Sequence, residues 1–250
     1  MTGPSGGPLR VPDPDVAEPT ALTDTHLFVA ADPATGAVEG LPLPGPVRTL
    51  LRALPGQTGA DFSRFVPPST GTRASAVLIL LAGPTADEPE PTVLLIERAA
   101  TLRQHAGQPA FPGGRVDPED AGPVAAALRE AEEEVGVDPA GVRVLATLPA
   151  LWVPVSASAV TPVVAWWDRE SPVGVVDTAE VARVARVSLR TLADPECRWR
   201  VRHPRGYVGP AFDVHGMLVW GFTAGLLDRV LALCGLTLPW DTERFRALPL

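Results

Sequence analysis

Nearly continuous apolar runs mark two segments of the chain. Residues 73–83 (RASAVLILLAG) and 92–98 (TVLLIER) fit strands that are buried in a core. The Gly, Pro and acidic residues between them favour a turn-rich connection. We therefore predict that the two segments pair as a β-hairpin with a long tip.

Two other segments carry helical patterns. Residues 45–54 (GPVRTLLRAL) have apolar positions at helical spacing and a proline near the start. In residues 123–135, Pro123 suits the first turn of a helix, and Gly136 suits its C-terminal cap. The sequence predicts a helix in each segment.

Strand and helix signals are mixed in the rest of the chain. Residues 142–148 and 160–167 favour strands, and polar and apolar positions alternate in residues 198–204. Residues 217–235 begin as a strand and end as an amphipathic helix. Because strands and helices do not alternate regularly, the sequence predicts an α+β fold instead of a doubly wound sheet.

Two segments are ambiguous. Residues 180–194 fit either a helix or a strand that is followed by a short helix from Ser188, because their valines have helical spacing and are also β-branched. Residues 99–114 have no clear period.

Composition and charge limit the classes of partner. The chain has 250 residues, 46% of them apolar, which is enough for one large domain or two small ones. Its 29 acidic and 21 basic residues give a net charge of −8, which is a poor match for DNA or an anionic membrane surface. An acidic protein that handles phosphates must bring cations into its site locally.

The ends of the chain differ from its middle. Residues 1–20 are rich in Pro, Gly and Asp and are predicted to be a disordered tail. Residues 21–72 form an extension of unknown role, which fits a tail, an arm that joins two copies in a homodimer, or a lid. Residues 73–236 form the main domain, and residues 237–250 form a C-terminal tail.

Targeting signals and cysteine pairs are not evident. The N-terminus has no apolar signal segment, and no run of about 18 apolar residues predicts a membrane span. Cys197 and Cys234 are far apart and lack CxxC spacing, which favours free thiols in a reducing cytosol. We expect a cytoplasmic protein.

A cluster of acids in residues 130–134 carries the candidate chemistry. Residues three and four apart share a face of a helix, so Glu130, Glu133 and Glu134 project together, and Glu132 points elsewhere. A hard divalent cation such as Mg²⁺ would offset their repulsion and leave room for substrate phosphates. A solvated acidic face explains the same cluster without a metal.

The surroundings of this cluster resemble the Nudix signature. The matching residues are Gly113 and Gly114, Arg129 and Glu130, Glu133 and Glu134, and Gly136. Two departures from the general pattern are Asp120, which stands in place of Glu, and a spacing from Gly114 to Arg129 that is one residue longer.

Residues 94–114 (LLIERAATLRQHAGQPAFPGG) resemble the second signature of the coenzyme A pyrophosphatase branch of the Nudix hydrolases. The matching residues are Leu94, Leu95, Arg98, Ala99, Arg103, Gly107, Phe111, Pro112, Gly113 and Gly114. This branch also carries the longer spacing and commonly has Asp at the position of Asp120. Pro109 departs from the Val or Ile of the family, and the pair at 180–181 is among the weaker matches.

This resemblance implies an α/β/α sandwich with a mixed sheet between helices and a function in diphosphate hydrolysis. It implies that Glu130, Glu133 and Glu134 bind Mg²⁺ or Mn²⁺ and that Arg129 orients these acids. The implied reaction is the cleavage of coenzyme A or acyl-CoA to 3′,5′-ADP and 4′-phosphopantetheine or its acylated form.

Further roles follow for the loop before the helix. Arg98 and Arg103 are expected to bind the phosphates of the substrate. Gly113 and Gly114 are expected to allow a tight turn and to supply a carbonyl to the metal. The sequence does not identify the general base.

Several interpretations stay open. Another nucleoside diphosphate derivative, such as ADP-ribose, NADH, capped RNA or an oxidised nucleotide, fits the Nudix signature, as does a non-catalytic nucleotide sensor. Trp152, Trp166 and Trp167 fit core packing better than stacking on an adenine. Acids that are splayed apart, or held by internal arginines with no room for an ion, would overturn the hydrolase assignment.

Overall fold

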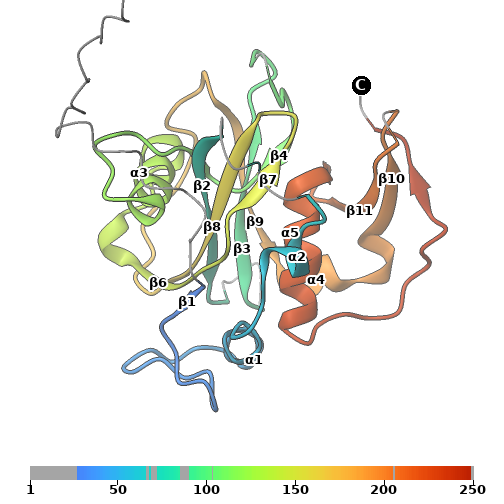
Figure 1. Cartoon of the computed structure of the whole chain (residues 1–250). Coiled ribbons are helices and arrows are strands. Elements are labelled where there is room, and N and C mark those ends of the chain that lie inside the picture. Colours follow the sequence, from blue (N-terminus) through green and yellow to red (C-terminus); the bar gives the residue numbers. More distant parts are fainter. Residues whose placement is uncertain are drawn as a thin grey trace, which may run out of the picture.

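The apolar run from Arg73 forms β2 (Arg73–Ala82), a central strand of a nine-stranded sheet (Figure 1). β2 pairs in parallel with β8 (Ser158–Trp167) along its whole length. It pairs antiparallel with β3 (Thr92–Arg98) at only two positions, Leu81 and Ala82. The computed structural model describes residues 27–65, 68, 72–84, 90–102, 104–204 and 206–248, so the predicted disordered tail lies outside the described residues.

β2 and β3 therefore diverge, and two short strands lie in the opening between them. β5 (Gly113–Arg115) pairs with the first half of β2, and β4 (Pro109–Ala110) pairs with the end of β3. The predicted hairpin is thus confirmed only at its tip. The segment without a clear period supplies β4 and the first two residues of β5.

The remaining elements complete two sheets and the helices around them. In the first sheet they are β1 (Phe28–Val29), β6 (Val142–Thr147), β7 (Leu151–Val153) and β9 (Val181–Ser188). The second sheet consists of β10 (Arg198–Arg202), β11 (Val208–Val214), β12 (Met217–Val219) and β13 (Phe245–Arg246). The helices are α1 (Gly45–Ala53), α2 (Gly59–Phe62), α3 (Pro123–Val135), α4 (Leu189–Ala193) and α5 (Gly221–Leu233), with 3₁₀ turns at Pro139–Gly141 and Pro195–Cys197.

Alternation along β2 gives the first sheet two apolar faces. Leu78 and Leu80 pack in one core with Ala127 of α3, while Ile79 and Leu81 pack in another core with residues of α1 and α5. Figure 1 shows α3 on one side of this sheet and α1, α4 and α5 on the other. The α+β class and the mixed sheet between helices are confirmed.

The second sheet packs against α5 and was not predicted. Its strand β10 contains Arg198, which is 2% exposed, forms an ion pair with Asp228 of α5, and lies over the rings of Phe212 and Trp240. β13 pairs in parallel with β10. Part of the segment interpreted as a C-terminal tail therefore belongs to this sheet.

Most other predictions of secondary structure are confirmed. The ambiguous segment at 180–194 contains β9 and then α4. Ser188 caps the N-terminus of α4, because its side chain accepts hydrogen bonds from two backbone N–H groups. Trp166 and Trp167 are buried in the cores, as expected for packing residues. Cys197 and Cys234 are free, and none of the described helices is long and apolar enough to cross a membrane.

Candidate active site

The acidic helix α3 is anchored to the sheet by small residues. Pro123 begins the helix, and Gly136 ends it in the left-handed conformation (φ 76°), as the sequence predicts. Ala127 and Ala131 are fully buried against the sheet. Their small size lets the helix lie close to β2 and β5, so that acids on this side of the helix meet the backbone of β5.

Glu134 is the most deeply buried of these acids, at 2% exposed. The backbone N–H of Gly113 donates a hydrogen bond to its Oε2 at 3.0 Å, while Oε1 is buried without a hydrogen-bond partner. Burial raises the pKa of Glu134 to about 8, and the Gly113 N–H and the charge of Arg98 oppose this rise. The carboxylate therefore lies where its negative charge is poorly compensated.

Glu130 lies directly over β5. A methyl group at Gly114 would come within 2.6 Å of Glu130 Oε2, so only glycine leaves room for this carboxylate. Burial also raises the pKa of Glu130, although the adjacent Arg129 lowers it. The glycine pair thus allows close contact with two acids, through an N–H at Gly113 and through the missing side chain at Gly114.

Arg129 connects the loop to the helix acids. Its guanidinium donates to both carboxylate oxygens of Asp120, at 3.1 and 2.9 Å, and to the carbonyl of Arg115 at 3.1 Å. It also donates to Glu130 at 3.2 Å and to Glu133 at 3.0 Å. The hydrogen bond with Arg129 holds the pKa of Asp120 below its usual range. These contacts tie the residue at the unusual Asp position to both acids.

The predicted site residues differ in how closely they gather. Arg98, at the end of β3, lies near enough for its charge to lower the pKa of Glu134, and its Nε is buried without a hydrogen-bond partner. Glu133 is 60% exposed and contacts Arg129. Arg103 lies outside the described residues.

Glu180 acts by its charge on the acids of α3, although it was not among the candidate residues predicted from the sequence. It directly precedes β9 and is exposed, and its charge raises the pKa of both Glu130 and Glu134. The only signal in the sequence was the weak family match at residues 180–181. β9 brings it to the acidic helix by pairing with β3.

The acids of this site offer carboxylate oxygens, which are the ligand atoms that a hard divalent cation prefers. Glu130 and Glu134 supply carboxylate oxygens, and the buried Oε1 of Glu134 has no hydrogen-bond partner. Within the described ranges, however, no three His, Cys, Asp or Glu side chains gather in a way that could hold a metal ion. Arg129 holds Glu130 and Glu133 through ion pairs, so an oxygen of each acid faces this arginine.

The burial of Glu134 predicts a dependence of stability on pH. A carboxyl group whose pKa rises on folding stabilises the folded state fully below its unfolded pKa of 4.5, and this contribution is lost as the pH rises through the folded pKa of about 8. In EDTA, the free energy of unfolding should therefore fall by a few kcal/mol between about pH 5 and pH 8. Urea denaturation across this range measures the fall. Glu134→Gln should flatten it, and an equal fall in both proteins would contradict the assignment to Glu134.

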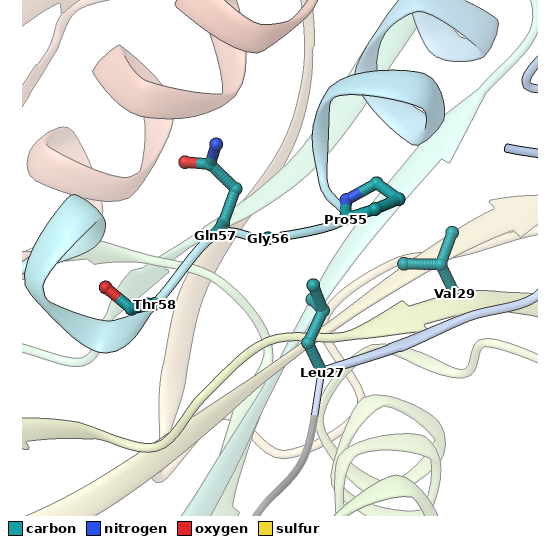
Figure 2. Close-up of a pocket in the computed structure, with 6 residues that line it drawn as sticks. All are labelled: Leu27, Val29, Pro55, Gly56, Gln57 and Thr58. Carbon is teal, nitrogen blue, oxygen red and sulfur yellow. The ribbon is translucent and has the colours of Figure 1, made fainter. Parts of the chain in front are cut away.

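A separate hollow of about 500 Å³ lies beside β1, away from the acids. Its lining comes from β1, with Leu27 before it, and from the connection between α1 and α2 (Figure 2). The lining residues are Leu27, Val29, Pro55, Gly56, Gln57 and Thr58. None of them is charged, so this hollow lacks the groups that a diphosphate requires.

Comparison with known proteins identifies the family of this chain. The family model described as the NUDIX domain matches residues 72–203. A protein of Cronobacter sakazakii (strain ATCC BAA-894), described as "Uncharacterized Nudix hydrolase NudL", is 41% identical over 172 residues, which cover 66% of this chain and 84% of that protein. A protein of Escherichia coli (strain K12 / DH10B) with the same description is 38% identical over 174 residues. This match covers 64% of this chain and 82% of the Escherichia coli protein.

Among solved structures, the crystal structure of RenU, a Nudix hydrolase from M. Smegmatis, is 20% identical to the chain. The match covers 69% of this chain and 91% of RenU, with a TM-score of 0.47. The family model matches residues 72–203, and two relatives are 41% and 38% identical. The chain therefore belongs to the Nudix hydrolase family.

Proposed function

We propose that this Nudix hydrolase cleaves the diphosphate of coenzyme A or acyl-CoA, with Mg²⁺ or Mn²⁺, to 3′,5′-ADP and 4′-phosphopantetheine or its acylated form. The observation that carries this proposal is the position of the 94–114 segment, which resembles the coenzyme A branch. This segment supplies most of β3, all of β4 and the first two residues of β5. Its Gly113 donates to Glu134, and the charge of its Arg98 acts on the same carboxylate.

The residues of the chain have separable tasks in this reaction. The Gly113 N–H fixes one oxygen of Glu134 and leaves Oε1 available as a ligand. Glu130 and Glu133 are the other proposed ligands, and for them to converge with Glu134 they must turn from Arg129. When bound, the divalent cation supplies positive charge that stabilises charge developing on the diphosphate oxygens. The charge of Arg98 acts on Glu134, which supports its proposed role as a second positive group for the diphosphate.

A substrate panel tests the proposal. Purified protein is incubated with coenzyme A, acetyl-CoA, ADP-ribose and NADH, with Mg²⁺, with Mn²⁺ or with EDTA, and the products are separated by chromatography. We expect 3′,5′-ADP from coenzyme A and acetyl-CoA only when a divalent cation is present. Much faster cleavage of ADP-ribose than of coenzyme A would contradict the substrate assignment.

Another diphosphate substrate is the second candidate, and Pro109 is the observation that favours it. This residue lies buried in β4 opposite Glu97, where the coenzyme A branch has a β-branched residue. A proline there fixes the backbone angle φ and removes an N–H, which changes the loop that leads to the site. Preferred cleavage of ADP-ribose or NADH in the panel would support this candidate. Failure to cleave any diphosphate would favour a nucleotide sensor.

A further inference from the structure

A small polar pocket lies on the other face of the sheet from α3. Its volume is about 140 Å³. Its lining contains two arginines, three serines and one glutamine. These residues are Arg73, Ser75, Gln104, Arg115, Ser156 and Ser158.

Strand register explains why these residues meet. Ser75 of β2 pairs directly with Arg115 of β5, and Arg73 pairs directly with Ser158 of β8. Paired residues lie on the same face of a sheet, and so do residues two apart on one strand. The four side chains therefore lie on one face by topology, and Ser156 joins them from the turn before β8.

The charge of the pocket is not neutralised by protein carboxylates. Arg73 donates to the carbonyl of Ser156 at 2.8 Å, which orients its guanidinium. Neither Arg73 nor Arg115 has an ion pair with any carboxylate in the part of the chain that the structure describes. Arg73 and Arg115 are both exposed and bring two positive charges to one pocket of a protein whose net charge is −8. Guanidinium groups match phosphate oxygens in a bidentate geometry, and serine hydroxyls add donors.

The pocket and the acidic site meet at consecutive residues of β5, on opposite faces of the strand. Arg115 directly follows Gly114, against which Glu130 lies, and adjacent Cα atoms are about 3.8 Å apart. The carbonyl of Arg115 accepts a hydrogen bond from Arg129, which also binds Glu130. Gln104 comes from the loop between β3 and β4. The short strand β5 therefore contacts Glu130 at Gly114 on one face and contributes Arg115 to the pocket on the other.

We propose that the pocket formed by Arg73 and Arg115 binds a phosphate monoester of the substrate, separate from the diphosphate that is cleaved. This inference rests on the proposed function, in which the substrate carries such a group on its ribose as the 3′-phosphate. The pocket then selects coenzyme A over substrates that have only a diphosphate. Arg73 and Arg115 are substrate-binding residues in this assignment.

Equilibrium binding tests the pocket without turnover. Isothermal titration in EDTA compares adenosine 3′,5′-bisphosphate, AMP and inorganic phosphate on the parent protein, Arg73→Met, Arg115→Met and the control Arg48→Met, an exposed arginine of α1. Each pocket variant should weaken binding of the bisphosphate about 10-fold or more and leave AMP within about 2-fold, because charge-assisted hydrogen bonds are lost. Arg48→Met should change neither. The proposal would be overturned if both pocket variants bound the bisphosphate as tightly as the parent protein does. It would also be overturned if inorganic phosphate bound as tightly as the bisphosphate.

Kinetics separate a failure of the pocket from a failure of the proposed function. Coenzyme A and dephospho-coenzyme A differ only in the 3′-phosphate, so the ratio of their kcat/KM values reports on this group. Arg115→Met should lower this ratio about 10-fold. If coenzyme A is hydrolysed and both pocket variants keep the parental ratio, the pocket assignment is wrong. If coenzyme A is not hydrolysed but the binding differences persist, the pocket stands and the proposed substrate falls.

Discussion

Glu134→Gln is expected to lower kcat for diphosphate hydrolysis by about 10²- to 10³-fold while the fold is retained. A cation at this site contributes several kcal/mol to transition-state stabilisation, and each 1.36 kcal/mol corresponds to a factor of ten in rate. Glutamine keeps the volume of glutamate and the acceptor for the Gly113 N–H, but it removes the charge that a cation requires. The measurement is kcat at saturating substrate and cation, together with circular dichroism of both proteins.

Glu132→Gln is the matched control. Glu132 lies on the same helix two residues earlier, is exposed, and undergoes the same chemical change. Its activity should stay within about 2-fold of the parent, because surface substitutions away from special contacts have small effects. A Glu134→Gln protein that keeps more than about a third of the parental kcat would show that this carboxylate is not a ligand of the catalytic cation.

The elements that the sequence predicted well are those with a local signal. α3 begins at Pro123 and ends before Gly136, as proposed, because both residues act on their own backbone. β4 and β5 were missed because strands of two or three residues that contain Pro and Gly have no period to detect. They are strands only because β2 and β3 diverge and leave backbone groups that need partners.

The candidate site was predictable to a similar extent. Family resemblance pointed to Glu130, Glu133 and Glu134 and to Arg129 as the residue that orients them, and Arg129 does contact two of these acids. It did not indicate that Glu134 is buried and accepts a hydrogen bond from the Gly113 N–H, because this depends on how closely α3 approaches β5. The pocket at Arg73 and Arg115 depends on the register of three strands, which the sequence does not encode locally.

Gly113→Ala is expected to destabilise the fold by about 2–4 kcal/mol, because the new methyl group has no space and the backbone is already unusual. Gly113 has φ 150°, and a Cβ atom there would lie 2.7 Å from Cα of Val77 and would overlap the carbonyl oxygen of Ala76. Both atoms belong to the backbone of β2, which is held along its length by β8 and cannot yield. Urea denaturation measures the loss, and a free energy of unfolding within about 0.5 kcal/mol of the parent would contradict it.

Gly114→Ala is the same substitution one residue further along the chain, but it is expected to act mainly on catalysis and not on stability. The new methyl group meets the carboxylate of Glu130, at the far end of a flexible side chain, instead of backbone. Glu130 can rotate away at little cost, so the free energy of unfolding should fall by only about 1 kcal/mol, while kcat/KM falls about 10- to 100-fold through the displaced carboxylate. Gly225→Ala, on α5 where a methyl group has open space, is the control and should keep full activity and gain up to about 1 kcal/mol of stability. If Gly114→Ala instead lost as much stability as Gly113→Ala and kept its kcat/KM, Glu130 would have no role in the reaction, and the contact with β5 would be structural.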